Sequence, residues 1–111
     1  MAIVPWVIDE VKLGVMRASI TLTDGDTSDE LSISDYSDKT IHIVPDDEAT
    51  VLGSNGVGTP QALHRANDPT LSFSAVSGEV LATIIENPMV IVASASGDDA
   101  TIVIIARDQK D

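Results

Sequence analysis

Hydrophobic and polar residues alternate along most of the chain, and this period of two predicts β-strands rather than helices. The clearest alternation runs over residues 15–23, where the even-numbered positions are apolar and most odd-numbered positions are polar. Residues 40–44 and 71–74 repeat the pattern. Two later runs, 89–95 and 100–106, are apolar on both faces. They predict two adjacent central strands joined by a short hairpin.

Turn signals separate these runs, for example Asp24-Gly25-Asp26 and Asn67-Asp68-Pro69. Residues 79–86 fit either a helical turn or a strand, and we favour a strand. About eight short strands at this spacing predict an all-β fold, a single antiparallel β-sandwich or jelly-roll-like domain. The side chains predicted to face its core are Ile20, Leu22, Ile41, Ile43, Phe73, Ile91, Ile102 and Ile104.

The stretch around Asn55-Gly56 carries the strongest turn signal in the chain. Asn-Gly tolerates positive φ at both central positions of a hairpin turn. Closely spaced glycines also let two backbones approach each other at a turn or bulge. We predict a hairpin turn here, with no chemistry of its own. Its residues are Gly53, Ser54, Asn55, Gly56 and Gly58.

The first sixteen residues are predicted to form an N-terminal arm, ahead of a β-sandwich domain over residues 17–111. Residues 3–8 are apolar but interrupted by Pro5, which limits them to an edge strand or an extended arm, and we favour the arm. An exposed apolar arm is unfavourable in water, so it is predicted to make contacts between subunits or with a larger assembly. The contact residues are Ile3, Val4, Trp6, Val7 and Ile8.

Composition narrows the function classes. The chain has 111 residues, which suits one domain, and a net charge of −12, which argues against a phosphate-binding surface and hence a nucleic-acid partner. No apolar run approaches the ~20 residues of a membrane-spanning helix, and the acidic N-terminal region does not resemble a signal peptide. Without cysteine there is no disulfide or thiolate metal site, which fits assembly in a reducing cytoplasm. The three aromatics, Trp6, Tyr36 and Phe73, leave the core mainly aliphatic.

Candidate chemistry is sparse. Acidic and hydroxyl residues alternate over 24–30, loosely like a calcium loop, but Asp29 occupies the place of the required turn glycine. A solvated acidic loop is the preferred interpretation. His42 and His64 lie in predicted strands without a third ligand at suitable spacing, so each is expected to be a surface or hydrogen-bonded histidine. The sequence also lacks a Gly-x-Ser-x-Gly elbow. We predict no enzyme activity, no metal and no cofactor.

Several short motifs follow one another at defined spacings between residues 17 and 107. They are Thr23-Asp24-Gly25-Asp26-Thr27, Ile33-Ser34-Asp35-Tyr36-Ser37-Asp38-Lys39-Thr40, Gly53-Ser54-Asn55, Asp68-Pro69, Leu71-Ser72-Phe73, Glu86-Asn87-Pro88 and Gly97-Asp98-Asp99. In this order they resemble a group of small structural proteins of tailed phages, which are capsid decoration (cement) proteins or similar virion components. The chain departs from those proteins at Gly56-Val57-Gly58 and in its longer apolar N-terminal segment.

The resemblance implies a compact β-sandwich without an active site, acting as a cement protein that stabilises the head shell. Its expected place is the capsid surface of the virion, after assembly in the bacterial host cytoplasm. The expected partners are the major capsid protein and further copies of the chain, as a trimer because capsid lattices offer three-fold positions. A carbohydrate-binding or adhesin-type sandwich on the virion is the alternative, although few aromatics are available to stack on sugars. A position in the head or in the tail stays open.

Overall fold

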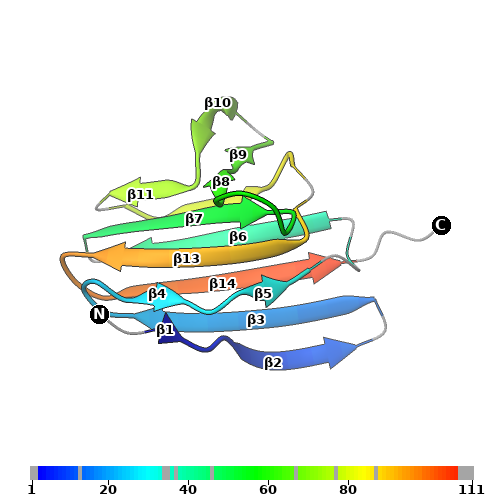
Figure 1. The fold of residues 1–111 in the computed structure, drawn as a ribbon, viewed down its shortest axis with the longest axis horizontal. Coiled ribbons are helices and arrows are strands. Elements are labelled where there is room, and N and C mark those ends of the chain that lie inside the picture. Colours follow the sequence, from blue (N-terminus) through cyan, green and yellow to red (C-terminus); the bar gives the residue numbers. More distant parts are fainter. Residues whose placement is uncertain are drawn as a thin grey trace.

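Two β-sheets face each other in the computed structural model (Figure 1). Every pairing between the described strands is antiparallel except that of β1 (Ile3–Val4) with β4 (Thr27–Ser28). The structure describes residues 3–12, 14–33, 36, 38–45, 47–66, 68–76, 78–86 and 88–107. None of these residues is helical, so no helix long and apolar enough to cross a bilayer is found among them.

The strand order defines a seven-stranded sheet, a five-stranded sheet and a small ribbon. The seven-stranded sheet runs β1 (Ile3–Val4), β4 (Thr27–Ser28), β13 (Val90–Ser96), β7 (Glu48–Ser54) and β11 (Ser74–Val76), with β5 (Leu31–Ser32) on β13 and β8 (Gln61–Ala62) on β7. The five-stranded sheet runs β12 (Val80–Thr83), β6 (Asp38–Pro45), β14 (Ala100–Arg107), β3 (Val15–Leu22) and β2 (Val7–Lys12). The ribbon pairs β9 (His64–Arg65) with β10 (Asp68–Ser72).

The core lies between the two large sheets and is built from alternating positions of their strands. Along β3, β6 and β14, every second side chain is buried, as the period of two requires. All eight side chains predicted to point inward are at most 3 % exposed, so this prediction is confirmed. Residues 79–86 supply β12, a strand as favoured from the sequence.

The two apolar C-terminal strands, β13 and β14, are not neighbours, and the prediction of a paired hairpin is wrong. β13 pairs with β7 in one sheet, whereas β14 lies between β3 and β6 in the other. The chain therefore crosses from sheet to sheet at the turn formed by residues 97–99. A strand whose residues are apolar on both faces is predicted to be central in a sheet. The pattern does not say which strands are its neighbours, because any other apolar strand could pack beside it.

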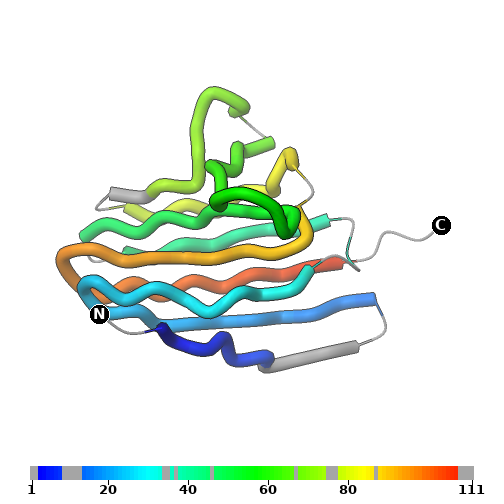
Figure 2. Tube along the Cα trace, in the orientation of Figure 1, coloured from blue at the N-terminus to red at the C-terminus, as the bar shows by residue number. Residues whose placement is uncertain are grey.

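The segment predicted as an arm contributes an edge strand to each sheet. β1 pairs with β4 and β2 pairs with β3, so residues 3–8 pass from one sheet to the other along one side of the sandwich (Figure 2). Pro5 lies between the two strands, where its missing N–H costs no ladder hydrogen bond. Trp6 packs against the core and donates its indole N–H to the Asp29 carbonyl at 2.8 Å. β3 already begins at Val15, so the described residues show no separation at the expected boundary of 16 and 17.

Lys39 is the only charged side chain among the buried residues that the structure describes. It is 2 % exposed and occupies an inward position of β6, in step with Ile41 and Ile43. Burial lowers the pKa of Lys39, because the charged ammonium is poorly solvated there, and the neighbouring Asp38 charge opposes that shift.

Candidate functional site

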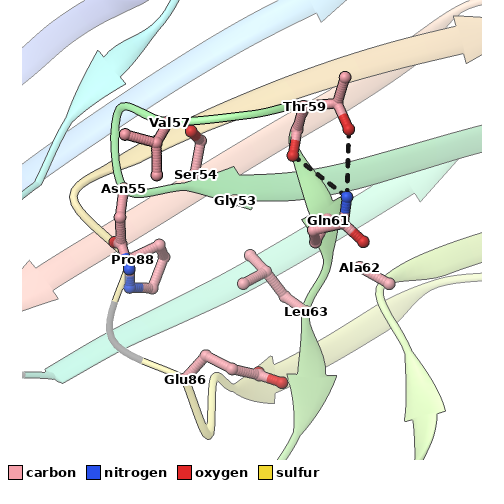
Figure 3. Close-up of a pocket in the computed structure, with 10 residues that line it drawn as sticks. All are labelled: Gly53, Ser54, Asn55, Val57, Thr59, Gln61, Ala62, Leu63, Glu86 and Pro88. Carbon is pink, nitrogen blue, oxygen red and sulfur yellow. Dashed lines mark hydrogen bonds between the residues drawn. The ribbon is translucent and has the colours of Figure 1, made fainter.

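A cleft of about 280 Å³ opens at one end of the seven-stranded sheet, where the chain leaves β7 (Figure 3). The loop of residues 55–60, strand β8, Glu86 and Pro88 surround it. The residues that line the cleft are Gly53, Ser54, Asn55, Val57, Thr59, Gln61, Ala62, Leu63, Glu86 and Pro88. The cleft therefore lies at the stretch predicted as a hairpin turn.

The loop that forms one wall follows from its glycines. β7 and β8 pair antiparallel, with Gly53 opposite Gln61, and residues 55–60 connect them, so the connection is longer than a two-residue Asn-Gly turn. Gly56 and Gly58 have φ of 87° and 69°, values that disfavour residues with a side chain. The Gly56 N–H donates to the Ser54 hydroxyl at 3.1 Å and holds the start of the loop.

The floor of the cleft is apolar and depends on Gly53. A Cβ atom at this position would lie 2.7 Å from Cδ2 of Leu63 and 2.9 Å from Cβ of Pro88. Both of those side chains belong to buried residues. They can pack directly over β7 only because residue 53 has no side chain, which is a recognised use of glycine inside a strand.

Two amide side chains on the rim are held by hydrogen bonds. The Asn55 carboxamide oxygen accepts the Met89 N–H at 3.0 Å, and Gln61 donates from Nε2 to the carbonyl and hydroxyl of Thr59, both at 3.2 Å. Figure 3 shows the two Gln61 contacts. Within the part of the chain that the structure describes, Asn55 Nδ2 and Gln61 Oε1 have no hydrogen-bond partner. One fixed donor and one fixed acceptor thus remain for a ligand.

Glu86 lines the cleft and is tied to His64. The His64 backbone N–H donates to Oε1 of Glu86 at 2.8 Å, and His64 Nδ1 lies 2.5 Å from Oε2. Burial of Glu86 favours the neutral acid, but the hydrogen bonds from the His64 side chain and backbone outweigh burial and lower the pKa of Glu86. The carboxylate is therefore charged at neutral pH and directed to its histidine partner.

Replacing Glu86 with glutamine is expected to lower the free energy of unfolding at neutral pH by less than about 1 kcal/mol, because the pair is half exposed. A carboxyl group whose pKa is lowered in the folded state stabilises the fold at pH values above its unfolded-state pKa of 4.5. This stabilisation disappears as the pH falls through the lowered, folded-state pKa. The difference between wild type and Glu86→Gln should thus vanish in acid. Urea unfolding at a series of pH values measures it, and a difference that grows on acidification would contradict this assignment.

The acidic loop considered as a calcium site is used for turn hydrogen bonds. Asp26 Oδ2 accepts from the Thr23 hydroxyl at 2.7 Å, and Asp24 Oδ1 accepts from the Gly97 N–H at 2.7 Å. Ser28 is buried, and its hydroxyl accepts the Ala93 N–H at 2.7 Å. Over the described ranges, no three histidine, aspartate or glutamate side chains are arranged to hold a metal ion.

His42 also has an acidic neighbour. Its Nε2 lies 3.4 Å from Oε2 of Glu79, and the two side chains are largely exposed. His42 and His64 therefore each have a carboxylate partner. The sequence predicted Gly53, Ser54 and Asn55 as a turn without chemistry of its own, whereas the structure places them at the cleft. Gln61, Glu86 and Pro88 were missed, because their approach depends on distant segments of the chain.

Comparisons with known proteins identify the fold. No protein-family model matches the sequence, and no curated protein is significantly similar to it. The SPBc2 prophage-derived protein YomS has a similar structure, with a TM-score of 0.58, 15 % identity, and coverage of 90 % of this chain and 97 % of YomS.

Cupins are similar to the same degree. A cupin domain from Bordetella pertussis Tohama I has a TM-score of 0.57 at 12 % identity, and the match covers 98 % of this chain and 99 % of the cupin domain. An RmlC-like cupin with a double-stranded β-helix fold, from Methanocaldococcus jannaschii, has a TM-score of 0.56 at 11 % identity, with coverage of 93 % and 80 %. At these identities the similarity concerns the fold alone. The chain has a jelly-roll-like all-β fold, as predicted from its sequence, and the comparisons add that cupins share this fold.

Proposed function

We propose that this protein is a non-enzymatic structural component of a phage particle that decorates the head shell as a homo-oligomer. Two independent features support the proposal: the motif order that resembles small virion proteins, and a fold shared with a prophage-derived protein over nearly the whole of both chains. Cupins share that fold as well. The argument for assembly therefore depends on the surface of this chain, and above all on its N-terminal edge.

The N-terminal edge, defined as Ile3, Val7 and Ile8, exposes large apolar side chains where both sheets end. Ile3 is 75 % exposed, Val7 55 % and Ile8 45 %. Their strands, β1 and β2, are the last in their sheets, so the outer backbone groups of this side have no neighbouring strand among the described residues. Exposed apolar edge strands associate readily with another chain through backbone pairing and side-chain burial. This edge is the observation that carries the proposal.

Charge favours contact through an uncharged surface. The chain carries a net charge of −12, so two copies repel each other through most of their surfaces. Val7 is the first of a row of cross-strand neighbours on the outer face of the five-stranded sheet, one residue from each strand. None of the residues in this row is acidic. The row consists of Val7, Ser19, Val103, His42 and Leu81. A second copy docked here would bury apolar area, and Glu79, which lies 3.4 Å from His42, is the carboxylate recorded beside this row.

Two lysines at the N-terminal edge are expected to prevent assembly. In the variant Ile3→Lys with Val7→Lys, a charge replaces apolar contact at two exposed positions, so the fold is retained while the oligomer dissociates to monomers. Size-exclusion chromatography with light scattering measures the mass. Deletion of residues 2–16 is a poorer test, since it removes β1, β2 and the start of β3.

Leu71→Lys is the matched control, because Leu71 is an exposed apolar residue of β10, in the ribbon outside both large sheets. It should keep the mass of the wild type, for which we expect a trimer. A monomeric wild type, or an oligomer that survives both edge lysines, would contradict the assembly proposal. A low-resolution map of the intact particle would then test whether the chain sits on the capsid surface.

A further inference from the structure

The cleft beside Gly53 combines an apolar floor with uncharged hydrogen-bonding groups that are already held in position. Leu63 and Pro88 form the floor, and the free donor of Asn55 and free acceptor of Gln61 lie on the rim. We propose that the cleft binds one residue of a neutral carbohydrate. This function is additional to assembly and uses a different part of the surface.

The size of the cleft suits a single sugar ring. Small-molecule sites in proteins span roughly 300–1,000 Å³. This cleft, at about 280 Å³, lies just below that range. The cleft is open to solvent rather than enclosed. A terminal residue of a glycan can therefore enter while the rest of the glycan stays in solvent.

The rim matches the chemistry of sugar hydroxyls, each of which both donates and accepts. Asn55 Nδ2 donates and Gln61 Oε1 accepts, and their carboxamides are fixed by Met89 and Thr59. The hydroxyls of Ser54 and Thr59 accept hydrogen bonds from protein N–H groups, so their protons are available for a ligand oxygen. Groups fixed in advance lose little conformational entropy when a ligand binds.

Charge selects against anionic sugars. Glu86 is the one ionisable residue among those lining the cleft, and its two oxygens already accept from His64. Its negative charge, added to the net charge of −12, repels uronic and sialic acids. A neutral hexose meets no such repulsion and leaves the pair of His64 and Glu86 intact.

The absence of an aromatic platform sets the affinity. Phe73 is fully buried, Trp6 and Tyr36 pack against the core, and none of the three lines the cleft. Apolar contact with the sugar ring therefore comes only from the aliphatic residues of the lining, which are Val57, Ala62, Leu63 and Pro88. We expect a dissociation constant of about 1 mM for a single site. Several copies on one assembly would bind a multivalent glycan much more tightly.

The test is an NMR titration of the full chain, labelled with ¹⁵N, with methyl glycosides of glucose, galactose, mannose and N-acetylglucosamine. At least one glycoside should shift the amide signals of Gly53, Ser54, Gly56 and Gln61 in a saturable manner. The methyl glycoside of glucuronic acid should not. Lack of any saturable shift for the four neutral glycosides, shifts confined to other regions, or saturable binding of the glucuronide would overturn the proposal.

Asn55→Asp is the most informative variant, because it keeps an oxygen that accepts the Met89 N–H and replaces the free donor with a charged acceptor. Binding should weaken at least tenfold, while unchanged amide signals of β3 and β14 show that the fold is retained. Thr21→Ala, on an exposed position of the other sheet, should bind like the wild type. Equal affinity of Asn55→Asp and wild type would contradict the assignment of the cleft.

Discussion

Replacing Ile104 with aspartate is expected to abolish soluble folding. Ile104 lies in the middle of β14, fully buried, with Ala18 and Ile41 as its neighbours on the adjoining strands. A carboxylate there is shielded from water, and burying it costs several kcal/mol in addition to about 2–5 kcal/mol of lost aliphatic packing. The buried Lys39, two residues from Ile41 on the neighbouring strand, offsets that cost only in part. A domain of this size has only about 5–15 kcal/mol of stability in total.

Thr101→Asp on the same strand is the matched control. Thr101 is exposed on the outer face of β14, so the same new charge should change stability by less than about 0.5 kcal/mol. Soluble yield and a circular-dichroism melting curve of both variants distinguish the two positions. A soluble Ile104→Asp protein with a cooperative melting transition would refute the core assignment.

Local alternation predicted much of this fold correctly for a physical reason. In a strand, neighbouring side chains point to opposite faces. Once Ile20, Ile41 and Ile102 are assigned to the core, every second residue of the same strand must face the core as well. The same rule places Lys39 inward, two residues before Ile41, and the sequence therefore contained the signal for its burial. Charge alone would have placed it at the surface.

Strand partners could not be predicted in this way, because pairing depends on contacts between distant segments. β13 and β14 follow each other in the chain but pair with β7 in one sheet and with β3 and β6 in the other. The N-terminal segment is a second example. Pro5 was recognised as a limit to sheet pairing, but the sequence did not reveal that the flanking residues would pair with different sheets.

The cleft was visible in the sequence only in part. The stretch from Gly53 to Gly58 indicated a turn, and it forms one wall. Its floor needs Leu63 and Pro88, and its ion pair needs His64 and Glu86, which no local pattern associates with Gly53. A glycine inside an apolar strand is nevertheless a signal that another segment packs closely against the backbone, and here that segment is the floor of the cleft.

Gly53→Ala is expected to destabilise the fold by about 1–3 kcal/mol, because the new methyl group would lie too close to Leu63 and Pro88. The cost comes from contact rather than from backbone conformation, since Gly53 is not among the glycines with positive φ. Gly58→Ala provides the comparison. Gly58 has a φ of 69° with open space around its Cβ position, so that variant measures backbone strain of about 1 kcal/mol without a steric clash.

A double-mutant cycle with Leu63→Ala tests whether the clash is the cause. Leu63→Ala alone should cost about 2–5 kcal/mol, because Leu63 is buried. In the double variant the shortened side chain at position 63 leaves space for the methyl group at 53. The loss of stability in the double variant should therefore be smaller than the sum of the losses in the two single variants, by about 0.5–3 kcal/mol. Part of the clash remains, since Pro88 still lies 2.9 Å from the added atom. Urea unfolding of the four proteins gives this coupling energy, and strictly additive costs would mean that Leu63 does not pack on Gly53 as described.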